Sequence, residues 1–208
     1  MFDVEKIRAD FPILSRTVNG KPLVYLDNGA SAQKPQVVID AIRTAYEHEY
    51  ANVHRGLHYL SNLATDKYEA VRGTVQRFLN AATEDEILFT SGTTEGINLV
   101  SYGWAAPRLQ AGDEIVLSVM EHHANIVPWH FLRERQGVKL VWVDIEADGS
   151  LDPQRVIDAI TPRTKLIAVT HMSNVLGTVV DIKTITAAAR ARGIPVLADG
   201  SQATVHAR

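Results

Sequence analysis

Short apolar runs alternate with amphipathic segments through the second half of the chain. The runs are continuous, as in parallel strands covered on both faces, and they span residues 114–119, 139–143, 165–170 and 195–198. The spacing of apolar residues between them predicts helices over residues 126–136, 153–160 and 182–192. Asp152 is placed to cap the second of these helices, and Gly193 to end the third. Strands that alternate with helices predict an α/β fold, with a parallel sheet, right-handed crossovers and helices on both faces.

The first twenty residues have a different pattern, which predicts a short helical arm over residues 1–20. Asp3 is placed as an N-cap, Phe2 can pack on Ile7 as a hydrophobic staple, and Pro12 closes the helix after about two turns. The dipeptide Asn19-Gly20 predicts a turn. Residues 21–208 are then expected to form one larger, partial domain.

The larger domain is expected to begin with two short strands and two helices. Apolar runs predict the strands at residues 23–26 and 86–90. Proline and periodic apolar residues predict the helices over residues 35–46 and 68–79.

The stretch at residues 91–98 joins the run at 86–90 to a helical pattern that continues through Trp104. A strand that turns through glycine into a helix leaves backbone N–H groups without partners, at the positive end of the helix dipole. Thr93 and Thr94 add hydroxyl groups, and Gly92 allows close approach, so the stretch is a candidate phosphate cradle. The alternative is an ordinary helix start with Thr93 or Thr94 as N-cap. Neither of the two common nucleotide-binding glycine motifs is present.

Composition narrows the classes of protein. The chain has 208 residues, of which 46% are hydrophobic and 22% charged, as in globular proteins. A net charge of -3 gives no reason to expect nucleic acid or a membrane surface as a partner. No long apolar run or signal peptide is seen, so a cytoplasmic protein is expected. The chain contains no cysteine, which excludes a thiol nucleophile among its residues.

Ligands of open α/β sheets bind beyond the carboxyl ends of the strands, so the residues there are the candidate site. Asp199 directly follows an apolar run, where a carboxylate is costly without a cationic partner; alternatively it caps the next helix. His122 and His123 follow an earlier strand and could stack on a flat ring, or could be surface residues. Asn174 is an amide donor or a turn residue before Gly177. With the cradle, these groups describe a pocket for a phosphorylated, cationic aromatic ring, the shape and charge of pyridoxal phosphate.

Two histidines around a glycine suggest a polar loop at residues 52–58. His54 and His58 are four residues apart, but Gly56 argues against a helix there, and no carboxylate stands nearby in the sequence. No metal site is predicted.

Several long motifs resemble the cysteine desulfurases of the SufS type, which are fold-type I pyridoxal phosphate enzymes of aminotransferase class V. They are LDNGASAQKP at 26–35, NVHRGLH at 52–58, SGTTEGIN at 91–98, MEHHANIVPW at 120–129, THMSNVLG at 170–177 and ADGSQA at 198–203. The resemblance implies an incomplete fold-type I large domain, with a parallel or mixed sheet, behind the short arm.

The resemblance also implies how the cofactor pyridoxal 5'-phosphate is held. Thr93 and Thr94 would bind its phosphate, and His122 would stack on its ring. Asp199 would keep the pyridine nitrogen protonated, which makes the ring an effective electron sink. Two amides would contact the ring hydroxyl: Asn174 and Gln202. Candidates for a substrate loop near the dimer partner are Ala30, His54 and Arg55.

The implied reaction takes sulfur from L-cysteine, giving L-alanine and an enzyme persulfide for iron–sulfur cluster assembly. A homodimer and a sulfur-acceptor protein of the Suf system are the implied partners. The family's Schiff-base lysine and persulfide cysteine lie beyond the residues that match here, so the 208-residue chain is expected to be inactive alone. Two alternatives remain open: another class V enzyme, such as a selenocysteine lyase or an aminotransferase, or a non-catalytic half that binds a partner chain.

Overall fold

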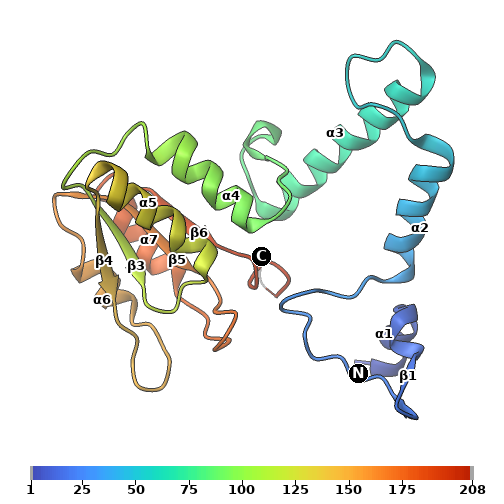
Figure 1. The fold of residues 1–208 in the computed structure, drawn as a ribbon, viewed down its shortest axis with the longest axis horizontal. Coiled ribbons are helices and arrows are strands. Elements are labelled where there is room, and N and C mark those ends of the chain that lie inside the picture. The colour runs from blue at the N-terminus through green and yellow to red at the C-terminus, as the bar shows by residue number, and fades with distance from the viewer. Residues whose placement is uncertain (1, 207–208) are drawn as a thin grey trace. The chain divides into compact units, whose positions relative to one another are not determined.

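A computed structural model describes residues 2–206 of the chain. The chain forms two compact units, the first ending at Leu88 and the second beginning at Phe89 (Figure 1). This division does not coincide with the predicted boundary after residue 20. Hydrogen bonds tie the arm to the segments that follow it, from the Gln36 amide to the Asp10 carbonyl (2.7 Å) and from Arg8 to the Leu23 carbonyl (3.5 Å). That residues 21–208 act as one partial domain therefore stays a prediction.

The first unit consists mainly of helices. Its elements are α1 (Val4–Ala9), the 3-10 turn η1 (Pro12–Ser15), β1 (Thr17–Val18), β2 (Lys21–Pro22), α2 (Gln36–Thr44), the π-helical turn η2 (Ala45–Glu49), α3 (Tyr59–Leu79) and the 3-10 turn η3 (Glu84–Glu86).

The predicted arm has the expected local structure. The Asp3 carboxylate accepts a hydrogen bond from the Lys6 amide at 3.1 Å, so it caps α1. The predicted turn is the tip of the β1–β2 hairpin, where both central residues are left-handed, with φ of 52° at Asn19 and 75° at Gly20. A two-residue hairpin turn needs this conformation, which asparagine and glycine adopt most readily.

The strands predicted at residues 23–26, in the first unit, and at residues 86–90, across the boundary between the units, are wrong. Ile87 has extended dihedral angles (φ -98°, ψ 115°), yet neither segment joins a sheet of the described chain. Extended apolar residues become a strand only where a second strand supplies the hydrogen-bonding ladder. The predicted helix at 68–79 is longer than expected and begins at Tyr59, capped by the side chain of His58.

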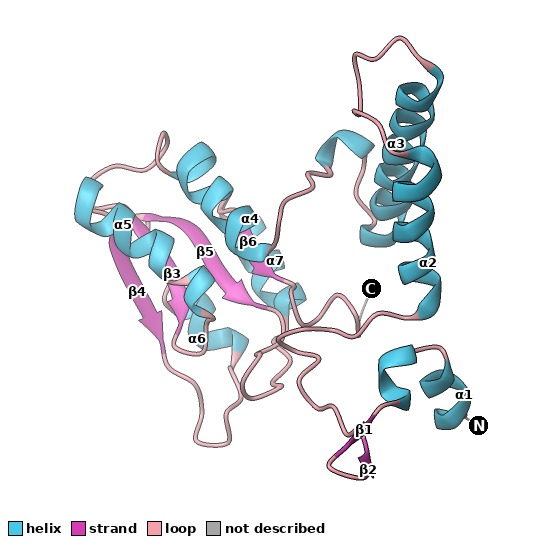
Figure 2. Cartoon of the chain, turned by 45° about the vertical axis from the view of Figure 1, so that its right-hand side comes forward, coloured by secondary structure: helices cyan, strands magenta, loops and turns pink. Residues whose placement is uncertain are grey.

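The second unit carries the predicted alternation of strands and helices (Figure 2). Its elements are α4 (Thr93–Leu99), the π-helical turn η4 (Val100–Ala105), β3 (Glu114–Ser118), the 3-10 turn η5 (His123–Asn125), α5 (Val127–Gln136), β4 (Lys139–Val143), α6 (Pro153–Asp158), β5 (Thr164–Thr170), α7 (Ile182–Arg190) and β6 (Val196–Asp199).

The sheet of this unit has the strand order β4-β3-β5-β6, and all neighbouring strands are parallel. The predicted α/β class is therefore confirmed. Each predicted strand of this sheet agrees with the structure to within a residue at either end. Asp152 caps α6 as predicted, whereas α7 ends at Arg190, before Gly193.

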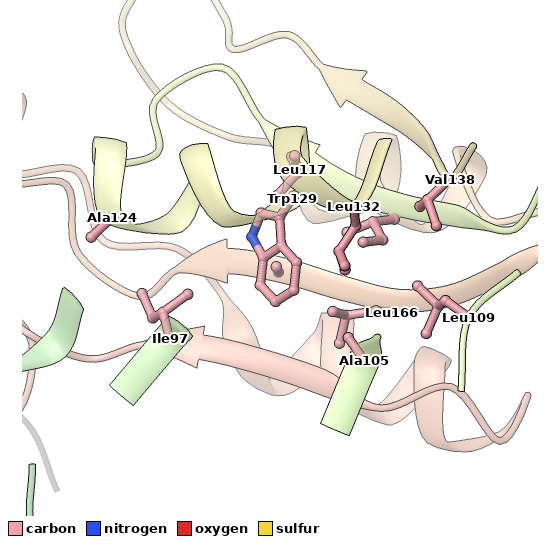
Figure 3. Close-up of a cluster of buried hydrophobic side chains, with 11 residues drawn as sticks. Ile97, Ala105, Leu109, Leu117, Ala124, Trp129, Leu132, Val138 and Leu166 are labelled. Carbon is pink, nitrogen blue, oxygen red and sulfur yellow. The ribbon is translucent and has the colours of Figure 1, made fainter. Parts of the chain in front are cut away.

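Both faces of the sheet are covered, as the continuous apolar runs predicted. On one face, Ile115 and Leu117 contact a cluster contributed by α4, η4 and α5. Figure 3 shows Trp129 reaching from α5 into this cluster, and its side chain has no exposed surface. On the other face, Val116 and Ile167 contact residues of α6 and α7. Alternate residues of one strand thus enter two cores, which requires the whole strand to be apolar.

Candidate active site

The carboxyl ends of the parallel strands place several predicted site residues at one edge of the sheet. Thr170, the last residue of β5, is paired in register with Asp199, the last residue of β6. The segment that carries His122 follows β3, the neighbour of β5 on its other side. β4 lies at the outer edge of the sheet, as expected for a strand whose end carries no candidate group.

A cleft of about 440 Å³ lies beyond the ends of β3 and β5. His122, His123 and Asn174 line it together, so the structure brings these predicted residues into one site. The His122 ring is fixed on one side, because its Nδ1 accepts the Ala124 amide at 3.1 Å. The rest of the side chain is exposed and available to a flat ligand.

Asp199 is buried, with only 6% of its surface exposed. Its Oδ1 accepts the Ser201 amide at 3.0 Å and lies 2.6 Å from the Ser201 hydroxyl. Residues 201–206 form turns, so the amide contact holds a turn, and the helix cap that the alternative predicted is not tested by it. Both donors are neutral, however, and within residues 2–206 no ion pair compensates the carboxylate. The cationic partner predicted for Asp199 is therefore not a side chain of the described part of the chain, and a cationic ligand would satisfy it.

Ser201 connects Asp199 to the cradle. Its hydroxyl oxygen lies 2.7 Å from the Thr93 hydroxyl oxygen, although the two residues are 108 positions apart. The cradle is thus held beside the end of β6, as the sequence predicted from the order of strands and helices.

The start of α4 differs from the plain capping alternative. Gly92 is the N-cap, no side chain caps the helix, and Thr93 and Thr94 are its first residues with exposed side chains. Thr93 or Thr94 as N-cap is therefore wrong. Glu95 is occupied elsewhere: it accepts hydrogen bonds from the Ser91 hydroxyl and amide, which lower the pKa of its carboxyl.

Because the first N–H groups of a helix have no partner within it, those of Thr93 and Thr94 form, with the two hydroxyls, a donor set for an anion. A Cβ placed on Gly92 would meet no described atom within 4 Å, so the approach to these donors is open.

Three predicted residues belong to the first unit: Ala30, His54 and Arg55. Ala30 is exposed in a turn closed by its amide and the Asp27 carbonyl (3.2 Å). His54 and Arg55 both have left-handed backbones, with φ of 62° and 56°. Their predicted part in a substrate loop or dimer contact is not tested by these contacts and stays a prediction, as does the role of Gln202, half-buried in the turn after β6.

The expectation that no carboxylate lies near His54 is wrong. The Glu69 carboxylate, from α3, lies 2.7 Å from His54 Nε2, and it also accepts a hydrogen bond from Arg72 at 3.0 Å. These two hydrogen bonds lower the pKa of Glu69. The sequence alone does not reveal the pair, because α3 brings together residues 15 positions apart. Across residues 2–206, no three His, Cys, Asp or Glu side chains are grouped so that they could hold a metal ion.

The site has one further polar group to which the sequence assigned no role. Glu121, the residue before His122, is only 7% exposed and lines the same cleft. Burial raises the pKa of its carboxyl, although hydrogen bonds from Ser118, Asn125 and the Thr170 amide act in the opposite direction. Glu121 follows the end of β3 after two intervening residues, so its position in the sequence is a weaker signal than that of Asp199.

The chemistry of these groups fits pyridoxal phosphate. Hydroxyl and amide donors at α4 suit a phosphate, an imidazole at the cleft suits a planar ring, and a buried carboxylate without a cation suits a protonated pyridine nitrogen. The fold and the site thus define an α/β protein with a ligand site at the carboxyl edge of a parallel sheet.

The chain belongs to the class V aminotransferase family, whose members are pyridoxal phosphate enzymes; the family model matches residues 24–208. This confirms the class V resemblance drawn from the motifs.

Known relatives agree with this membership. A cysteine desulfurase of Salmonella gallinarum is 53% identical over 99% of the chain. The crystal structure of the cysteine desulfurase CsdA from Escherichia coli is similar with a TM-score of 0.84, 39% identity and 99% of the chain covered. An apo cysteine desulfurase from Thermococcus onnurineus is similar with a TM-score of 0.87 and 35% identity, and the match covers 95% of the chain. The chain spans about half the length of these proteins: 50% of the Salmonella protein, 50% of CsdA and 47% of the Thermococcus protein.

No helix within residues 2–206 has the length and apolar character needed to cross a membrane.

Proposed function

We propose that the protein containing this chain is a pyridoxal phosphate-dependent cysteine desulfurase. It takes sulfur from L-cysteine and gives L-alanine and an enzyme persulfide, which supplies iron–sulfur cluster assembly. The observation that carries this proposal is the buried Asp199 carboxylate, which has neutral donors only and is linked through Ser201 to Thr93 at the start of α4. The cysteine desulfurases among the relatives support the choice of reaction within the family.

The cofactor, when bound, supplies an electron-accepting ring that stabilises negative charge developing on the substrate. Asp199 holds a proton at the ring nitrogen, because a buried carboxylate strongly favours a cation beside it. The imidazole of His122, which lines the cleft, would stack on the ring. Two amides bind the ring hydroxyl: Asn174 and Gln202.

Thr93 and Thr94 anchor the phosphate at the start of α4. Hydrogen bonds to a charged group contribute about 1.5 to 3 kcal/mol each, so this end of the site accounts for much of the retention of the cofactor. Ser201 links Thr93 to Asp199, so the residues that would hold the phosphate and the ring nitrogen are fixed relative to each other.

The proposed reaction also needs residues from outside this chain. The chain contains no cysteine, so the persulfide must form on a residue beyond residues 1–208. We further propose a homodimer, in which Ala30, His54 and Arg55 lie near the substrate or the partner subunit, and a sulfur-acceptor protein of the Suf system.

The test uses a full-length version of the protein, purified and supplied with pyridoxal phosphate. We expect the cofactor to bind in a 1:1 ratio and L-alanine to form from L-cysteine. The 208-residue chain alone should form no alanine and no single-site adduct that borohydride traps. Alanine from selenocysteine only, or amino transfer without sulfur release, would contradict the proposed reaction in favour of another class V enzyme. Absence of cofactor binding in the full-length protein would indicate a non-catalytic half that binds a partner chain.

A further inference from the structure

Glu121 and Asn125 form a buried bracket around the turn that carries His122. The Glu121 carboxylate accepts hydrogen bonds from the Ser118 hydroxyl and, at 2.7 Å, from the Asn125 side-chain amide. Ser118 is the last residue of β3, so Glu121 ties the turn to the end of this strand.

Asn125 passes this anchoring to His122. It has no exposed surface, and its Oδ1 accepts the Trp129 indole N–H at 3.0 Å. Its backbone amide donates to the His122 carbonyl at 2.7 Å. The next amide back, that of Ala124, donates to His122 Nδ1 at 3.1 Å and fixes the ring. The orientation of His122 therefore depends on a chain of contacts that begins at Glu121.

The donors to Glu121 in this bracket are all uncharged, as are those to the buried carboxylate of Asp199. Glu114, at the other end of β3, is equally buried but forms an ion pair with Arg163 at 2.8 Å. Glu121 instead lies near the Asp199 carboxylate, whose charge adds to burial in raising the pKa of Glu121. A buried acid beside a second acid costs stability, so its presence at the cleft needs a reason other than holding the fold together.

We propose that Glu121 is a positioning residue of the active site: with Asn125 it fixes the turn that presents His122 to the cofactor ring. This inference rests on the proposed function, in which His122 lies against the ring. A glutamine amide has the shape of a carboxyl group: its oxygen can accept the Asn125 amide, and its NH2 can donate to the Ser118 hydroxyl, which accepts as well as donates, so Gln can replace Glu121 in the bracket, whereas Ala cannot.

The experiment measures amide hydrogen exchange of Ala124 and Asn125 in the full-length protein without cofactor. Glu121→Ala should accelerate exchange at both amides about tenfold or more, because the turn loses its anchor, and Glu121→Gln should stay within about twofold. Ser118→Ala, which removes one donor only, should give a smaller acceleration in the same direction. It keeps the test decisive should Glu121→Ala fail to fold.

Glu114→Ala is the matched control, since it removes a buried carboxylate from the opposite end of the same strand. It should leave the exchange rates of the Ala124 and Asn125 amides unchanged even where it lowers the overall stability of the protein. Equal acceleration by Glu114→Ala, or none by Glu121→Ala and Ser118→Ala, would overturn the proposal and leave Glu121 as an ordinary part of the fold.

The second readout is the visible circular dichroism of bound pyridoxal phosphate, which reports the surroundings of the ring. Glu121→Ala should change this signal and speed cofactor release about tenfold, while Glu121→Gln restores both. Faster exchange at the turn with an unchanged cofactor signal would contradict the proposal. Failure of the unmodified full-length protein to bind the cofactor would instead refute the proposed function, and the exchange data would still decide whether Glu121 holds the turn.

Discussion

The two units of the chain are held together by different means. In the first unit, the buried positions are few: Ser61, Gly73 and Ile87. Its order comes from caps, a hairpin turn and side-chain hydrogen bonds, such as that between His54 and Glu69. The second unit has two buried apolar clusters, one on each face of a parallel sheet. Burial of apolar surface is the dominant favourable contribution to folding, so the second unit is the part that can hold side chains in fixed positions for chemistry.

The same contrast appears in the glutamates. Glu69 of the first unit meets His54 and Arg72 at the surface, and its pKa is lowered. Glu121 of the second unit is buried among neutral donors, and its pKa is raised. The surroundings of Glu69 thus favour its charged form and those of Glu121 favour its neutral form, whereas other carboxylates of the second unit, such as Glu95 and Glu114, are held in the charged form.

The largest expected effect on stability concerns the apolar core. Trp129→Ala should reduce the free energy of unfolding by about 3–5 kcal/mol, because it removes a fully buried ring and leaves a cavity. Ile42→Ala, in the first unit, removes a side chain that is 54% exposed and should change stability by less than about 0.5 kcal/mol. Urea unfolding, monitored by hydrogen exchange at the Ile167 amide in the sheet, measures the free energy of unfolding of both variants. Similar losses for the two variants would contradict the difference between the units.

The next effect concerns the anion donors at the start of α4. In a full-length version, replacing Thr93 and Thr94 together by Ala should weaken cofactor retention by about 1.5 to 3 kcal/mol for each hydrogen bond lost. Cofactor content after dialysis is the readout. Thr74→Ala, on the surface of α3 in the first unit, is the control and should retain the cofactor normally. Unchanged occupancy in the double variant would return residues 91–98 to a plain helix start.

The smallest effect is the pH dependence of stability, which should have opposite signs at Glu121 and at Glu69. Because the pKa of Glu121 is raised in the folded state, its contribution to stability is present below the ordinary glutamate pKa and is lost as pH rises through the folded value. Because the pKa of Glu69 is lowered, its contribution is present above the ordinary value and is lost as pH falls through the folded one.

The free energy of unfolding is measured from about pH 4 to about pH 7 for the unmodified protein and for the Gln variant of each glutamate, whose side chain does not titrate. Relative to Glu121→Gln, the unmodified protein should lose stability as pH rises; relative to Glu69→Gln, it should gain. The same sign for both would show that the two environments do not differ as described.

The sequence was informative wherever one segment determined its own structure. Continuous apolar runs predicted the strands of the second unit, because each run supplies residues to both cores. Asp199 and His122 could be proposed as site residues because strand ends of a parallel sheet meet at one edge, whereas Thr93 follows a segment that forms no strand and was proposed from the start of its helix.

Features that depend on a second segment could not be predicted in this way. The runs at 23–26 and 86–90 have strand composition but no strand beside them in the described chain. Glu69 was not expected beside His54, since only the folding of α3 brings them together. The bracket of Glu121 needs the end of β3 and the turn η5 at once. A sequence pattern reports local preference and burial, whereas these contacts are properties of the assembled sheet.

The central claim is that Asp199 serves the chemistry of a bound cofactor rather than the turn after β6. The most direct test is Asp199→Asn in a full-length version, with L-alanine formed from L-cysteine measured per bound cofactor. The variant keeps the shape and can still accept the Ser201 amide, but it lacks the charge that holds a proton at the ring nitrogen. We expect turnover per bound cofactor to fall by roughly 100-fold or more, with a much smaller loss of occupancy. Near-normal turnover per bound cofactor would contradict the account and leave Asp199 as a capping residue.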